Sequence, residues 1–206
     1  MPLRLSEIHP VTVHLPITLA PVALLLDAVG AATGNRGLLG TGRVLMGAAF
    51  AGAVGAGVTG VLAQGVSKVE EGEPHDLLTT HRTINGALTL LLGALAASRA
   101  LDDRPGPGYF AGGAAAVALM GYSSYLGSQM SYEHGVGSAR AGGLRDRAAI
   151  GRSSPSRLAE AVVEAIGRAI QETLADIRNG RFLPFLRRYV RRPITAGPGM
   201  RSLPLP

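Results

Sequence analysis

The sequence predicts an all-α fold, a four-helix transmembrane bundle with a C-terminal amphipathic helix. The chain is 47% hydrophobic, yet only 4% of it is aromatic and it has no tryptophan. It has 29 glycines, many of them spread through its apolar runs, a composition typical of helices that pack closely in lipid. Four apolar segments are also long enough to cross a hydrocarbon core of ~30 Å at ~1.5 Å per residue. We therefore expect a chain that is built within a bilayer.

The first crossing is predicted over residues 11–32. It is not expected to be a cleaved signal peptide, because a basic n-region is nearly lacking and no small-residue cleavage site precedes a polar domain. Pro10 near the first turn costs no interior hydrogen bond, whereas Pro16 leaves the carbonyl of Thr12 without its helical donor. We expect this loosened turn to direct His14 into the bundle.

The other three crossings are predicted over residues 41–64, 83–101 and 109–130. The connections TGNRG, SKVEEGEPHD and DDRPGPG contain breakers or charges and separate the four apolar segments. The second crossing carries small residues at four-residue spacing, which predicts a face where another helix approaches closely. These residues are Ala48, Gly52, Ala56 and Gly60.

Alternating crossings bring the histidines to one membrane face. We call side A the face with the chain start, the second connection and the residues after the fourth crossing, and side B the opposite face. All five histidines fall on side A: His9, His14, His75, His81 and His134. A polar stripe in the fourth crossing joins them: Tyr122, Tyr125, Gln129 and Tyr132. Together they predict an imidazole-rich pocket at side A, and the alternative is that they only anchor helix ends at the interface.

Three short motifs resemble a known family. The motifs are HPVTVHLPITL in the first crossing, the pair His81 and Arg82 before the third, and YEHGVG after the fourth. Over roughly residues 5–140 they resemble the bacterial membrane family known as domain of unknown function 2231. The resemblance implies a four-helix membrane fold and no established reaction. It places four histidines at motif positions: His9, His14, His81 and His134.

Two cofactor hypotheses follow from the histidines, both with an electron-transfer or redox-related role. One haem b would take axial imidazoles from among His9, His14, His81 and His134, with Arg82 near its propionates. Only one haem is expected, because no second histidine layer lies toward side B. The alternative is a divalent metal, held by His14, His81, His134 and Glu133.

A third hypothesis is a non-catalytic membrane scaffold whose polar face and basic tail recruit a partner. An enzyme is disfavoured, because no nucleophile motif such as G-x-S-x-G is present and Ser123 has no neighbouring catalytic residues in the sequence. Asp27 lies toward side B, where we expect Arg36 or Arg43 to neutralise it; the alternative is a lone proton-carrying carboxylate.

The chain is predicted to divide into four regions. They are a transmembrane domain at 5–135, a Gly/Arg/Ser linker at 136–155, a basic amphipathic helix with its extension at 156–192, and a disordered C-terminus at 193–206. The tail helix repeats apolar residues every four positions at Leu158, Val162, Ile166, Ile170 and Leu174, after Ser154 and Pro155 and before Asn179 and Gly180.

The tail also suggests the partners of the chain. Arginines dominate after residue 134, with aromatic residues beside them but no nucleic-acid module, so we expect an anionic lipid surface and no nucleic acid as the partner. Docking on a partner helix or in a homo-oligomer is the alternative. From the wider basic tail we expect side A, with both termini, to face the cytoplasm and the protein to lie in a bacterial inner membrane.

Overall fold

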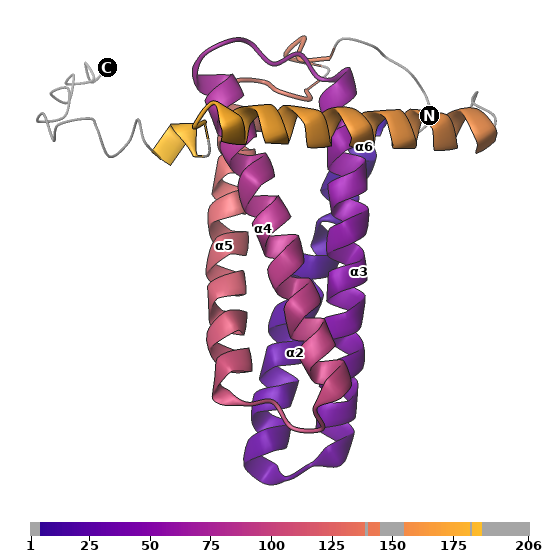
Figure 1. Ribbon diagram of the computed structural model, residues 1–206, viewed down its shortest axis with the longest axis vertical. Coiled ribbons are helices and arrows are strands. Elements are labelled where there is room, and N and C mark those ends of the chain that lie inside the picture. Colours follow the sequence, from indigo (N-terminus) through magenta and orange to yellow (C-terminus); the bar gives the residue numbers. More distant parts are fainter. Residues whose placement is uncertain (1–4, 139, 145–154, 182, 187–206) are drawn as a thin grey trace, which may run out of the picture.

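The computed structural model describes residues 5–138, 140–144, 155–181 and 183–186. Its helices are α1 (Leu5–Thr12), α2 (His14–Thr33), α3 (Arg36–Val66), α4 (Glu73–Leu101), α5 (Pro107–Tyr132) and α6 (Pro155–Arg178). Helices α2 to α5 lie along one common axis, and α6 crosses this bundle near its side A end (Figure 1). The predicted disordered C-terminus and most of the arginine-rich extension lie outside the described residues.

Three helices in the described ranges are long and apolar enough to cross a membrane. They are Glu7–Thr33, which joins α1 and α2, then Arg36–Val66 and Glu73–Leu101. Helix α5 has 26 residues but is not among them, and its last turns contain tyrosine, serine and glutamine. The protein is thus an all-α membrane protein, and a fourth crossing by residues 109–130 stays a prediction.

Helices α1 and α2 are almost continuous. Val13 between them keeps a right-handed helical backbone, with φ −64° and ψ −22°, and its N–H donates to the His9 carbonyl at 3.1 Å. Pro16 has no N–H to donate, which interrupts the helical ladder at this point. The joint is therefore a local interruption within one spanning segment, Glu7–Thr33.

The small residues of α3 form the predicted packing face. A Cβ added at Gly52 would lie 2.8 Å from the Cβ of Leu15, and one at Gly60 would lie 3.0 Å from the His9 ring. Both glycines thus allow α1 and α2 to approach the α3 backbone closely. The turn into α3 is set by Asn35, whose side-chain oxygen accepts from two backbone N–H groups of the first helical turn at 2.9 and 3.2 Å.

A buried ion pair ties the helices together near side B. The Nε and Nη2 atoms of Arg99 in α4 donate to the two carboxylate oxygens of Asp27 in α2, each at 3.0 Å. Both side chains are 0% exposed. The Tyr109 hydroxyl of α5 donates to the same carboxylate at 2.7 Å, and Arg99 also donates to the Leu39 carbonyl of α3 at 3.0 Å. One charged pair therefore contacts α2, α3, α4 and α5.

The prediction that Arg36 or Arg43 neutralises Asp27 was wrong. Arg43 instead pairs with the exposed Asp103 in the α4–α5 connection at 2.8 Å, and its hydrogen bond lowers the pKa of that carboxyl. Asp27 faces α4 across the bundle interior, and Gly42 of α3 leaves room for its carboxylate, with which an added Cβ would collide. The direction of the Asp27 side chain therefore selects Arg99.

Replacing Arg99 by Met should strongly destabilise the bundle, because it leaves the Asp27 carboxylate buried and unpaired. The expected loss in free energy of unfolding is about 3 to 5 kcal/mol, measured by denaturant titration in detergent micelles. Arg43→Met is the matched control and should cost about 1 kcal/mol or less, since its ion pair is exposed. Adding Asp27→Asn to Arg99→Met should recover part of the loss; equal losses for Arg99→Met and Arg43→Met would contradict the role of the pair.

Candidate functional site

A histidine and a serine meet between α4 and α5 in the side A half of the bundle. His81 Nδ1 lies 3.0 Å from the carbonyl oxygen of Ser123 and 3.1 Å from its hydroxyl. The Asn85 amide donates to the same hydroxyl at 2.7 Å. Because a carbonyl only accepts hydrogen bonds, Nδ1 must carry the proton and Nε2 the lone pair.

This arrangement does not activate Ser123 as a nucleophile. A general base needs a free lone pair toward the hydroxyl, but the nitrogen nearest to Ser123 is the protonated Nδ1 of His81. In the sequence Ser123 has no neighbouring catalytic residues, whereas the structure puts His81 and Asn85 beside it. The four-residue spacing of His81 and Asn85 indicates a shared helix face, but only the packing of α5 on α4 brings Ser123 to that face.

A second histidine packs between α1 and α3. His9 Nδ1 donates to the Ala56 carbonyl at 3.0 Å, and the Thr59 hydroxyl lies 3.4 Å from the same nitrogen. Thr59 also bonds to the Thr12 hydroxyl at 2.8 Å. His9 and His81 are both half-buried in the side A half of the bundle.

The other predicted histidines lie elsewhere. His14 is exposed, and its Nδ1 donates to the Pro10 carbonyl one turn earlier at 2.6 Å. The expectation that the proline-loosened turn directs His14 inward is therefore wrong, because its own helix captures the ring. His134 is exposed in the segment after α5, and His75 is half-buried in the first turn of α4.

The side A connections border a partly open polar cavity of about 260 Å³. Both His134 and Glu133 line it, together with Lys68, Glu70, Pro74, Val136 and residues 141–143. The YEHGVG motif turns here through Gly135 and Gly137, at φ 64° and 75°, where glycine is favoured. Part of the predicted linker is thus packed, since the Lys68 N–H donates to the Gly143 carbonyl at 2.9 Å.

The predicted metal ligands do not come together. In the described ranges, no three histidine, cysteine, aspartate or glutamate side chains form a group that could hold a metal ion. His14 faces outward, His81 lies between α4 and α5, and His134 lies with Glu133 at the loop cavity. This geometry gives no support to the proposed set of His14, His81, His134 and Glu133.

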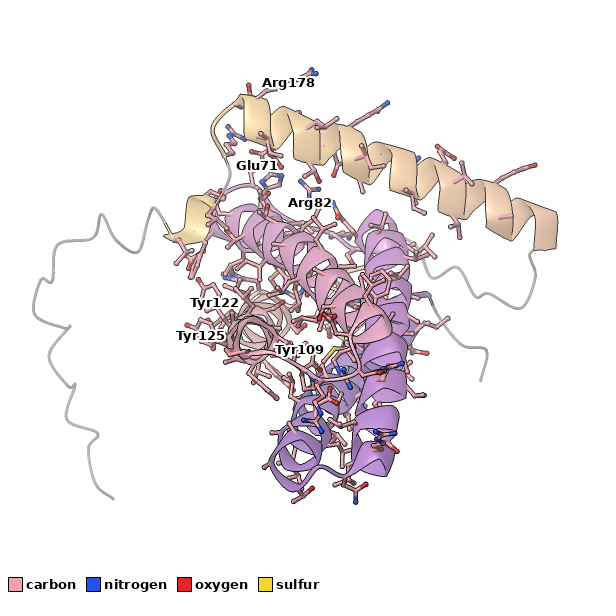
Figure 2. The ribbon with its side chains drawn as sticks, turned by 60° about the horizontal axis from the view of Figure 1, so that its bottom comes forward. Glu71, Arg82, Tyr109, Tyr122, Tyr125 and Arg178 are labelled. Atoms are coloured by element: carbon pink, nitrogen blue, oxygen red, sulfur yellow. The ribbon has the colours of Figure 1, made fainter. Side chains whose placement is uncertain are left out.

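The tyrosine stripe of α5 does not line an interior pocket. Tyr122 and Tyr125 stack with their ring centroids 6.3 Å apart, on the outer side of α5 (Figure 2). Tyr125 is 48% exposed and Tyr132 is 87% exposed. These rings therefore occupy the surface of the bundle, where aromatic side chains are common near a membrane interface.

The comparison with known families agrees with the motifs. A family model described as "Predicted membrane protein (DUF2231)" matches residues 6–140. The chain belongs to this family. The DUF2231 region holds His9, His81, Ser123 and the family motifs, and it ends before α6. No curated protein and no solved structure matches the chain.

The side A histidines should differ in chemical reactivity. Diethylpyrocarbonate in detergent solution should modify the exposed His134 quickly and His81 slowly, because α4 and α5 enclose the His81 ring and its Nδ1 is hydrogen-bonded. Mass spectrometry of the modified peptides measures both rates in one sample. Ser123→Gly removes the hydroxyl beside the ring and should speed the modification of His81 alone. Equal rates for His81 and His134 in the unaltered chain would contradict the described packing.

Proposed function

We propose that this protein is a non-catalytic membrane scaffold that holds the amphipathic helix α6 at side A of the membrane. The observation that carries the proposal is a double ion pair. Arg82 of α4 donates to Glu172 at 2.6 Å and to Asp176 at 2.5 Å. The two carboxylates lie one turn apart on α6. A guanidinium that binds both of them sets the position and the rotation of the helix.

Contacts on either side of Arg82 support the same attachment. Gln64 near the end of α3 donates to Glu172 at 3.1 Å. After α6, the chain returns to the bundle, where Leu183 and Phe185 pack on an apolar cluster at the side A end of α4 and α5. The Phe185 N–H also donates to the Thr80 hydroxyl at 3.2 Å. Helix α6 is thus held by α3 and α4, and the segment that follows it by α4 and α5.

In this proposal the interior histidines stiffen the part of the bundle that carries α6. His9 joins α1 to α3 through the Ala56 carbonyl, and His81 joins α4 to α5 through the Ser123 carbonyl. Interhelical hydrogen bonds in a membrane stabilise a given packing of neighbouring helices. The histidines would then act as structural hydrogen-bond donors rather than as ligands.

A crosslinking test addresses the scaffold directly, because the chain has no cysteine of its own. The side chains of Gln64 and Glu172 meet at their tips, so Gln64→Cys combined with Glu172→Cys should be joined by a short bis-maleimide crosslinker in the folded protein, detected by mass spectrometry of the linked peptides. Adding Arg82→Ala should lower the yield of the crosslink. Adding Arg178→Ala is the matched control and should leave the yield unchanged. If the crosslinker does not join the two cysteines, α6 does not dock as proposed.

A haem b protein with an electron-transfer role is the second candidate. It is favoured by the hydrogen bonds of His9 and His81, whose Nδ1–H groups each meet a backbone carbonyl, as metal-bound histidines usually do. Each ring then has Nε2 free for a ligand. Arg82 is engaged with α6, so the propionate role predicted for Arg82 has no support.

An absorbance spectrum decides this second candidate. After haem-replete expression, a Soret band should copurify with the protein, be lost in His9→Ala and His81→Ala, and persist in His14→Ala. The physical reason is that only the first two rings turn into the bundle. A protein without a Soret band, even after reconstitution with haem, would remove haem from consideration.

A further inference from the structure

Helix α6 keeps one apolar stripe that no other part of the described chain covers. The stripe consists of Val163, Ile170, Leu174 and Ile177, which are 70%, 55%, 47% and 49% exposed. At about 100° per residue, these four side chains fall within a sector of about 60° on the helix. A continuous exposed stripe of this kind marks a surface that a partner or a membrane covers.

The attachment of α6 decides where the stripe points. The docked face contains Ala165, which is 6% exposed, and Asp176, which pairs with Arg82. In Figure 1, α6 runs from right to left in front of α3 and α4, with side A at the top. At about 100° per residue, the centre of the stripe lies about 140° around the helix from these two residues, so for a right-handed helix in this position the stripe is directed down the bundle toward side B and outward from it.

The opposite flank of α6 is polar. By the same helical geometry, Glu172 and Arg168 lie on the flank that faces away from side B, and Figure 2 shows Arg178 pointing away from the bundle. Glu172 meets Gln64 and Arg82 on this flank. The helix thus presents its polar side toward water and its uncovered apolar side along the outer wall of the spanning helices.

The level of α6 along the bundle matches a membrane boundary. Helix α6 contacts Gln64 in the last turns of α3 and Arg82 in α4. After Arg82, the sequence of α4 becomes apolar. From Arg82 to the buried Arg99 is about 25 Å at ~1.5 Å per residue, comparable with a hydrocarbon core of ~30 Å. Below this level the spanning helices also expose large apolar side chains, such as Leu90 at 77%.

We infer that α6 lies in the membrane interface with its apolar stripe inserted among the acyl chains of the side A leaflet. This inference rests on the proposed function, because the docking on Arg82 sets the rotation of α6. The occupant is lipid rather than a protein, since the stripe faces along the same wall that lipid must cover. Helices of this type bind by burying their apolar face at the boundary between headgroups and acyl chains.

The charge of α6 favours acyl-chain contact over attraction to anionic lipid. The helix carries both signs, with the acidic residues Glu160, Glu164, Glu172 and Asp176 and the arginines Arg157, Arg168 and Arg178. The insertion should therefore occur in neutral phosphatidylcholine vesicles. The attraction to anionic lipid predicted from the sequence depends on the arginines after residue 186, which lie outside the described residues.

Fluorescence quenching of single-cysteine variants tests the insertion. Leu174→Cys and the matched control Gln171→Cys, both exposed on α6, would be labelled with an environment-sensitive fluorophore and placed in phosphatidylcholine vesicles. We expect the label at 174 to be quenched by lipids with brominated acyl chains and protected from iodide. The label at 171 should behave in the opposite way. A label at 174 that iodide quenches and brominated lipid does not would overturn the inference.

The crosslinking and quenching results together distinguish a failure of this inference from a failure of the proposed function. If the crosslink between positions 64 and 172 forms but the label at 174 is not quenched by brominated lipid, the inference fails and the scaffold stands. If the crosslink does not form, the scaffold itself fails. Protection of the label at 174 from both quenchers, with crosslinking between copies through Ile170→Cys, would show that a second copy covers the stripe and would also overturn lipid insertion.

Discussion

The arrangement of the spanning helices depends on the ion pair between Asp27 and Arg99. A bilayer core has no water to solvate a charge, so each of these groups must find its partners within the protein. The pair satisfies this requirement with two parallel hydrogen bonds and with donations from Tyr109 and to the Leu39 carbonyl. A slide or rotation of α2 or α4 would separate the two charges. The packing of the neighbouring apolar side chains is therefore fixed together with the register of these helices.

The two ends of the bundle use polar groups differently. Near side B, one enclosed pair of opposite charges joins α2, α3, α4 and α5. In the side A half, His9 and His81 each join only two helices through a hydrogen bond to a carbonyl. A neutral hydrogen bond costs less to break than a buried ion pair. Side A is also the end where the loop cavity and the attachment of α6 are found.

The attachment of α6 joins a part of the chain that the family model matches to a part that it does not match. Arg82 belongs to the HR motif and lies inside the region that the DUF2231 model matches. Its partners Glu172 and Asp176 lie on α6, outside that region. In the proposed scaffold, the family domain thus supplies the guanidinium and the appended helix supplies the carboxylates. The same pairing turns the apolar stripe of α6 toward the leaflet, so one residue of the domain orients the whole helix.

The sequence by itself determined the membrane class, the family, the helical segments and the end of α6 before Gly180, because length, composition and capping residues are local properties. Only the tertiary structure decided that Asp27 pairs with Arg99, that Ser123 meets His81, and that His14 points outward. In a soluble helix, apolar periodicity marks the buried face. A helix in lipid is apolar on all sides, so its sequence does not fix its rotation or its register with neighbours. These depend on contacts between residues far apart in the chain, which the folded structure alone brings together.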